Sequence, residues 1–261
     1  MSEPAQPDIV AELRAVIDGP IGDFPRYRRL IIAAGEARCT GAGGLLETIV
    51  RRNAAFERVQ PDRYEDVPLA LDALAAIADR EPAPAVARLL ADDHFGPRAT
   101  TAALRYLAAV RYRAAAGIAA DLLGHGEPAV REAAAAALGQ MGSARHAEAL
   151  AAALSDPVRA VAEAAALALA MAGDARGRTL ILAALASRPA SEPIEALAVL
   201  GDPEDGVNIA RHADHPDATV RAAVASALAD LDPHRFRRVL AVLASDRVPQ
   251  VAAAARAGLD G

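Results

Sequence analysis

The sequence contains no tryptophan and no lysine, and aromatic residues make up only 3% of its 261 positions. A single cysteine, Cys39, excludes an internal disulfide framework. No uncharged apolar run is long enough to cross a bilayer as a helix, so no transmembrane segment is expected. The first residues lack the basic and apolar stretches of a secretory signal, and we therefore expect a cytoplasmic protein.

All 28 basic residues are arginine, and 34 acidic residues outnumber them to give a net charge of −6. This balance argues against non-specific binding to nucleic acid. Hydrophobic residues make up 53% of the chain, and alanine is by far the most frequent of them. Because alanine has the best helix propensity and its small side chain lets helices approach closely, the composition predicts an all-α protein.

A sequence repeat organises most of the chain. Its anchor positions are Ala99, Val130, Val161, Val220 and Val251, which follow one another at a constant step except that the step from Val161 to Val220 spans two units. From Val130, apolar residues recur at helical spacing, which gives one apolar stripe per helix. A period of this length with two helices per unit predicts a solenoid, in which neighbouring units share one continuous core.

Each unit contains a helix A, a short turn and a helix B. The predicted pairs are 24–35 with 43–58, 66–79 with 83–91, 97–110 with 113–123, 128–141 with 144–154, 158–172 with 175–186, 192–200 with 203–212, and 217–230 with 234–244. A last helix at 248–259 has no partner, and residues 9–17 form an additional capping helix. Glycine after helix A and Asp-Pro or Ser-Asp-Pro before the next one mark the helix ends.

The stretch "EPAVREAAAAALGQMG" at residues 127–142 resembles the short HEAT-like repeat first associated with phycobilisome lyases. The resemblance covers residues 65–261 well and 24–64 weakly. We therefore divide the chain into residues 1–64, a capping helix with an irregular first repeat, and residues 65–261, the regular repeats. The resemblance implies a right-handed α-solenoid of about seven antiparallel helix pairs, with the B helices lining the concave surface.

The resemblance also implies two alternative functions. The first is a bilin lyase or a subunit of one, although no residue points specifically to a bilin site. The second is nucleic-acid binding by a basic concave face, which the acidic net charge and the absence of tryptophan oppose. Some HEAT-repeat hydroxylases bind iron through His-Glu pairs, but no histidine in this sequence is followed directly by glutamate.

A row of arginines recurs on the B helices, mostly at their starts. Cations near a helix N-terminus oppose the macrodipole, at a cost of about 0.3–1 kcal/mol each, so the row calls for an explanation. One interpretation is a partly basic groove that docks an acidic protein segment. The other is solvated arginine paired with neighbours such as Glu148. The candidate residues are Arg113, Arg145, Arg176, Arg178, Arg211, Arg235 and Arg238, with Arg51, Arg52 and Arg88 on other B helices.

The loops before the A helices carry a second pattern, with a polar residue five positions before each anchor. These residues are His94, His125, Asp156, His215 and Asp246. One such residue per unit cannot converge on a single ion, so we predict turn and capping chemistry and no metal site. Arg131 and Arg221, one residue after their anchors, are expected to brace the loops.

We therefore expect a non-catalytic scaffold that binds a protein or peptide, with an acidic segment as one candidate, and that uses no cofactor, no membrane contact and no nucleic acid. Charge reversal at Arg145 and Arg176 is expected to weaken partner binding. The partner and the oligomeric state stay open.

Overall fold

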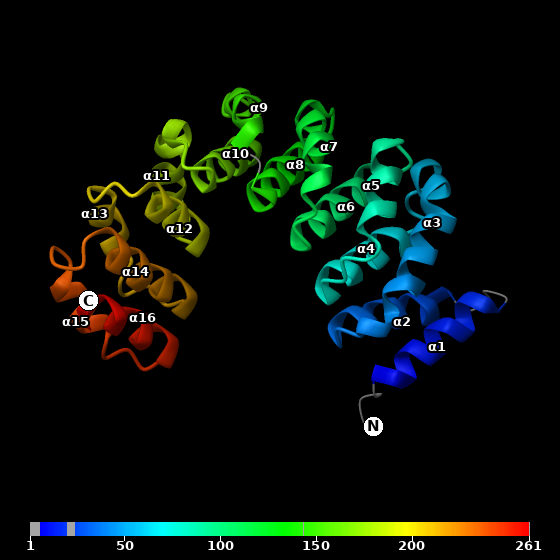
Figure 1. Cartoon of the computed structure of the whole chain (residues 1–261), viewed down its shortest axis with the longest axis horizontal. Coiled ribbons are helices and arrows are strands. Elements are labelled where there is room, and N and C mark those ends of the chain that lie inside the picture. The colour runs from blue at the N-terminus through cyan, green and yellow to red at the C-terminus, as the bar shows by residue number, and fades with distance from the viewer. Residues whose placement is uncertain (1–5, 20–23, 143, 261) are drawn as a thin grey trace. The chain divides into compact units, whose positions relative to one another are not determined.

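The computed structural model describes residues 6–19, 24–142 and 144–260. Every regular element in these ranges is a helix, so the predicted all-α class is confirmed (Figure 1). Within the same ranges, no helix is long and apolar enough to span a membrane. The first residues, on which the expectation of no secretory signal rests, lie outside the described part of the chain.

The chain divides into two compact units, residues 1–146 and 147–261. The helices of unit 1 are α1 (Gln6–Asp18), α2 (Phe24–Glu36), α3 (Gly43–Val59), α4 (Asp66–Ile77), α5 (Ala83–Ala91), α6 (Pro97–Ala109), α7 (Ala116–Asp121) and α8 (Pro128–Met141). Short 3-10 turns accompany them: η1 (Thr40–Ala42), η2 (Arg113–Ala115), η3 (Leu122–Gly124) and η4 (Ala144–His146).

Unit 2 continues the alternation of helices. It contains α9 (Ala147–Ala153), α10 (Arg159–Met171), η5 (Ala175–Gly177), α11 (Arg178–Ser187), α12 (Ser191–Leu200), α13 (Asp205–Ala210), α14 (Ala218–Leu231), α15 (Arg237–Leu243) and α16 (Pro249–Asp260). These bounds confirm the predicted helices to within a few residues. The division at residue 64, made on repeat regularity alone, stays a prediction.

Local sequence sets the ends of the A helices. Proline begins α6 and α8, where its missing N–H costs nothing because the first turn has no intrahelical partner. Gly142 and Gly201 end α8 and α12 in the left-handed conformation, with φ of 68° and 72°. This conformation reverses the chain within a few residues, so each B helix returns along its A helix.

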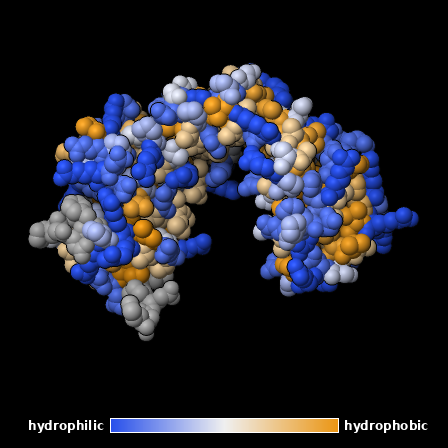
Figure 2. Space-filling view, turned by 180° about the vertical axis from the view of Figure 1, so that it is seen from behind, coloured by the Kyte–Doolittle hydropathy of each residue, from blue (hydrophilic) through white to orange (hydrophobic). Residues whose placement is uncertain are grey.

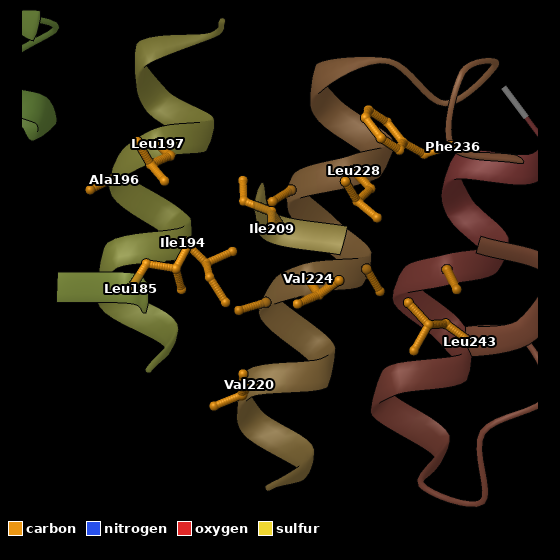
Figure 3. Packing of buried hydrophobic residues seen from close by; sticks show 14 of the residues in the cluster. Leu185, Ile194, Ala196, Leu197, Ile209, Val220, Val224, Leu228, Phe236 and Leu243 are labelled. Carbon is orange, nitrogen blue, oxygen red and sulfur yellow. The ribbon is translucent and has the colours of Figure 1, made fainter. Parts of the chain in front are cut away.

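The core of unit 2 shows how neighbouring repeats share apolar surface. Side chains from α10 to α16 form one buried cluster. In Figure 3, Ile209 of α13 lies between Leu197 of α12 and Val224 of α14, so side chains of three helices from two repeats belong to one cluster. No single helix pair can bury its stripe alone, which is the property that defines a solenoid.

The A helices are the closely packed layer of each unit. In unit 1, α2, α4, α6 and α8 pack in sequence against one another, as do α10, α12, α14 and α16 in unit 2, whereas consecutive B helices of unit 2 barely touch. Within each unit, Figure 1 shows the A helices on the inner side of the curve. The expectation that B helices line the concave side is therefore wrong.

The physical reason lies in the buried alanines. Helix α10 buries Ala162, Ala165, Ala166 and Ala168, so its neighbours approach to the distance that a methyl group allows.

Candidate functional site

The structure places the seven candidate arginines in or next to the B-helix segments, which form the outer layer of each unit. Arg113 and Arg145 lie in η2 and η4 of unit 1. The other five belong to unit 2: Arg176 in η5, Arg178 at the start of α11, Arg211 after α13, Arg235 just before α15, and Arg238 within α15. Whether the row binds a partner stays a prediction.

Two of these arginines are held by carboxylates of their own unit. Arg176 contacts Glu148 of α9 at 3.0 Å and Asp174 at 2.6 Å. The hydrogen bonds from Arg176 lower the pKa of Asp174. Arg178 donates two hydrogen bonds to Asp205 of α13, from Nε to Oδ2 at 2.9 Å and from Nη2 to Oδ1 at 2.5 Å. The Asp205 side chain is fully buried. Arg178 therefore neutralises a charge that would be costly to bury alone.

A third arginine continues this pattern along unit 2. Arg235 contacts Glu204 at 2.7 Å, and its hydrogen bonds lower the pKa of Glu204. The pairs of Arg178 and Arg235 join one repeat to the next across 27 and 31 residues of sequence. Arg176, Arg178 and Arg235 are therefore each paired with a carboxylate of unit 2.

The remaining candidates have different surroundings. A side chain at Gly142 would begin 3.8 Å from the guanidinium of Arg113, which places this cation at the C-terminus of α8, where the helix dipole favours it. The Nε–H of Arg145 donates to His146 at 3.2 Å. Within residues 6–19, 24–142 and 144–260, no acidic side chain forms an ion pair with Arg145, Arg211 or Arg238.

The polar residues before the A helices act as turn caps, as predicted. His125 Nδ1 accepts the N–H of Glu127, and His215 Nδ1 accepts the N–H of Asp217. Asp156 and Asp246 accept the equivalent N–H groups of Val158 and Val248 at 2.8 Å. Histidine and aspartate thus serve the same purpose, which explains their exchange along the chain.

Arg221 is the predicted brace. It donates to the carbonyls of His215 and Pro216 in its own loop and to both carboxylate oxygens of Asp246 in the next loop. These hydrogen bonds lower the pKa of Asp246 to about 2. The contribution of Asp246 to stability is therefore present above the pKa of an unfolded aspartate and is lost as the pH falls toward 2. Arg131 donates to the carbonyls of His125 and Gly126 in the same manner.

His94 departs from this pattern. Here the N–H of Gly96, two residues on, donates at 2.8 Å to Glu57 of α3. Glu57 is fully buried, and its Oε1 has no hydrogen-bond partner in the part of the chain that the structure describes. Burial raises the pKa of Glu57 against the lowering effect of the Gly96 hydrogen bond. A distant carboxylate therefore replaces the local turn residue.

Among the described residues, no group of three or more His, Cys, Asp or Glu side chains converges. His212 and His215, three residues apart, therefore lack further ligands in that part of the chain. Burial lowers the pKa of His212, and the neighbouring His215 adds to this effect.

Sequence reasoning missed an apolar surface on α3. Phe56 is 57% exposed and Val59 is 76% exposed, and Phe56 stacks on Tyr64 with ring centroids 5.5 Å apart. The signal was available, since residues 52, 56 and 59 share one helical face, but a single exposed aromatic cannot be told from a core residue without the neighbouring helices.

Neighbouring repeats share an apolar core, repeat the same turn caps and are joined by arginine–carboxylate pairs. These features define a helical-repeat protein, an α-solenoid. A family model described as HEAT repeats matches residues 117–201. A comparison with curated proteins found no match.

A comparison with solved structures found an engineered protein with a similar fold, and further chains with lower TM-scores. An engineered protein from the Northeast Structural Genomics Consortium is 19% identical with a TM-score of 0.53, over 97% of this chain and 77% of that one. The complex of CpcE and CpcF of phycocyanin lyase from Nostoc sp. PCC7120 is 23% identical with a TM-score of 0.48, over 67% and 74%. Human deoxyhypusine hydroxylase in complex with glycerol is 16% identical with a TM-score of 0.43, over 98% and 96%. At 19% identity the likeness to the engineered protein concerns the fold alone.

Proposed function

We propose that the chain is a non-catalytic scaffold that binds an acidic segment of a partner protein through the outer, B-helix side. One observation carries this proposal. Arg145 occupies the position that Arg176 occupies in the following repeat. Arg176 is held by Glu148 and Asp174, but the equivalent positions before Arg145 carry Gly117 and Ser143.

Arg145 is thus equivalent to Arg176 in the repeat, but the positions equivalent to Glu148 and Asp174 carry no carboxylate. A guanidinium in that state favours a carboxylate from another molecule, because a charge-assisted pair is about twice as strong as a neutral hydrogen bond. The partner is therefore expected to present glutamate or aspartate rather than basic residues.

The test uses a fluorescent glutamate-rich peptide and the full chain, with binding measured by anisotropy at low and high salt. Arg145→Glu is expected to weaken binding about tenfold, because a favourable charge pair becomes a repulsive one. Gly117→Glu places a carboxylate at the position equivalent to Glu148 and is expected to weaken binding by competing for Arg145, while Gly117→Gln is its uncharged control.

Arg235→Glu is the matched control for charge reversal. Because Arg235 is already paired with Glu204, the Arg235→Glu variant should have a lower melting temperature than the wild type. Its affinity for the peptide should change less than that of Arg145→Glu. Equal affinity of the wild type and Arg145→Glu for the peptide would sink the proposal. Tighter binding to a DNA oligonucleotide with a steep salt dependence would support the nucleic-acid alternative instead. A shifted absorbance band on mixing with a bilin would support the lyase alternative.

A further inference from the structure

The outward face of α3 combines exposed apolar side chains with exposed arginines. This face is defined by Thr48, Arg51, Arg52, Ala55, Phe56 and Val59, which recur at helical spacing. Its C-terminal half is apolar, with Phe56 and Val59 both more than half exposed. Its N-terminal half is cationic. Over most of the visible surface, polar side chains separate small apolar patches (Figure 2).

The charge of this face has one sign. Of the two glutamates of α3, Glu57 is fully buried, and the Glu47 side chain is only 24% exposed. Arg51 is 67% exposed and lies 3.7 Å from Glu47, a distance at which an exposed pair contributes little. Arg52 donates to the carbonyl of Ile17 at 3.2 Å, which fixes its side chain without neutralising it.

Two observations independent of charge mark the same face. A surface hollow is lined, among the described residues, by Thr48, Arg51 and Arg52, so a side chain of another molecule has space beside the cations. Phe56 stacks on Tyr64 from the following loop, and more than half of Phe56 stays exposed. Aromatic residues and arginine are both enriched in protein interfaces.

We propose that the α3 face binds a partner segment that carries an aliphatic or aromatic side chain next to glutamate or aspartate. The apolar side chain covers Phe56 and Val59, and the carboxylates lie against Arg51 and Arg52. This site rests on the proposed scaffold function and deepens it by giving the acidic partner an apolar anchor, and it does not use Arg145. In this proposal the irregular N-terminal repeat also takes part in partner binding.

The test uses two fluorescent peptides, one with leucine pairs between glutamates and one in which serine replaces each leucine. The full-length wild type is expected to bind the leucine peptide about tenfold more tightly. Phe56→Ser with Val59→Ser should abolish this preference, whereas Arg51→Gln should weaken both peptides and preserve it. The control is Val242→Ser on α15, an equally exposed apolar position at 74%, which should change neither affinity by more than about twofold.

The outcomes separate this site from the scaffold proposal. Loss of the leucine preference in Phe56→Ser/Val59→Ser, with an unchanged melting temperature, supports the α3 site. If both peptides bind the wild type equally, the site is wrong while the acidic scaffold stands. If neither peptide binds, both proposals fall. An equal effect of Val242→Ser, or tighter binding of a single-stranded oligonucleotide than of either peptide, overturns the assignment of this occupant.

Discussion

At the scale of single residues, the buried carboxylate of Glu57 accepts a backbone N–H that a residue of the loop itself accepts in other repeats. Other loops cap their own backbone with aspartate or histidine five positions before the anchor. The loop at His94 relies on Glu57 instead, which lies 39 residues before Gly96 in the chain. Burying this carboxylate has a free-energy cost, because its Oε1 finds no partner among the described residues to replace its hydration.

This cost leads to a prediction about pH. Burial raises the pKa of Glu57, so the folded state holds the proton more tightly, and the associated stability is lost as the pH rises through that raised pKa. Glu57→Gln keeps an acceptor for the Gly96 N–H without the charge. Urea unfolding from acidic to slightly alkaline pH should show the variant gaining stability over the wild type as the pH rises. Parallel stability curves would contradict this account.

Residue-scale prediction from the sequence succeeded where partners are local and failed where they are distant. The caps at His125 and Asp246 act on N–H groups two residues away, so spacing alone identified them. The partner of Arg178 is Asp205, 27 residues on and fully buried, and several acidic residues lie at comparable separations. Only the packing of α11 against its neighbours selects among them.

At the scale of helices and turns, close approach decides where glycine is required. A Cβ on Gly177 would lie 2.6 Å from the backbone Cα of Ala166, so η5 sits directly on α10. Gly117, in α7, has no atom within 4 Å of the same hypothetical Cβ among those considered. The two glycines therefore make a matched pair of sites.

Gly177→Ala is expected to destabilise the protein by about 1–3 kcal/mol, because backbone cannot move aside as a flexible side chain can. Gly117→Ala should stabilise it by about 0.5–1 kcal/mol, since alanine loses less conformational entropy in a helix. Chemical denaturation of both variants gives the comparison. Equal effects at the two positions would show that η5 does not pack as closely as described.

The sequence predicted the helices themselves well, since α8 begins and ends at the expected residues, Pro128 and Met141. It did not predict which layer lies inside. Both layers carry apolar stripes, and the inner layer follows from how closely alanine-lined helices approach, a property of pairs of helices rather than of one stretch of sequence. For the same reason the exposure of Phe56 required coordinates.

At the scale of the molecule, each repeat is stabilised mainly by its neighbours. Leu228 of α14 is fully buried among side chains of the repeats on either side. In such an array, stability is approximately the sum of local terms and interfaces between adjacent repeats. Damage to one repeat is therefore expected to spread to its neighbours first.

Leu228→Ala should cost about 2–5 kcal/mol through lost burial and the cavity it leaves. Amide hydrogen exchange is expected to accelerate in α12 to α16, while α2 to α6 keep the protection of the wild type. Uniform acceleration through all helices would mean that the chain unfolds as one cooperative unit, contrary to the one-dimensional description.

The brace formed by Arg221 and Asp246 has a consequence for protein engineering. Arg221 donates to Asp246 in the next loop and to carbonyls of its own loop, so one side chain ties two successive loops together. A block running from Val220 to just before Val251 contains both Arg221 and Asp246, so each tandem copy of the block carries one complete ion pair. Copying this block is expected to lengthen the array by one repeat that keeps its own brace.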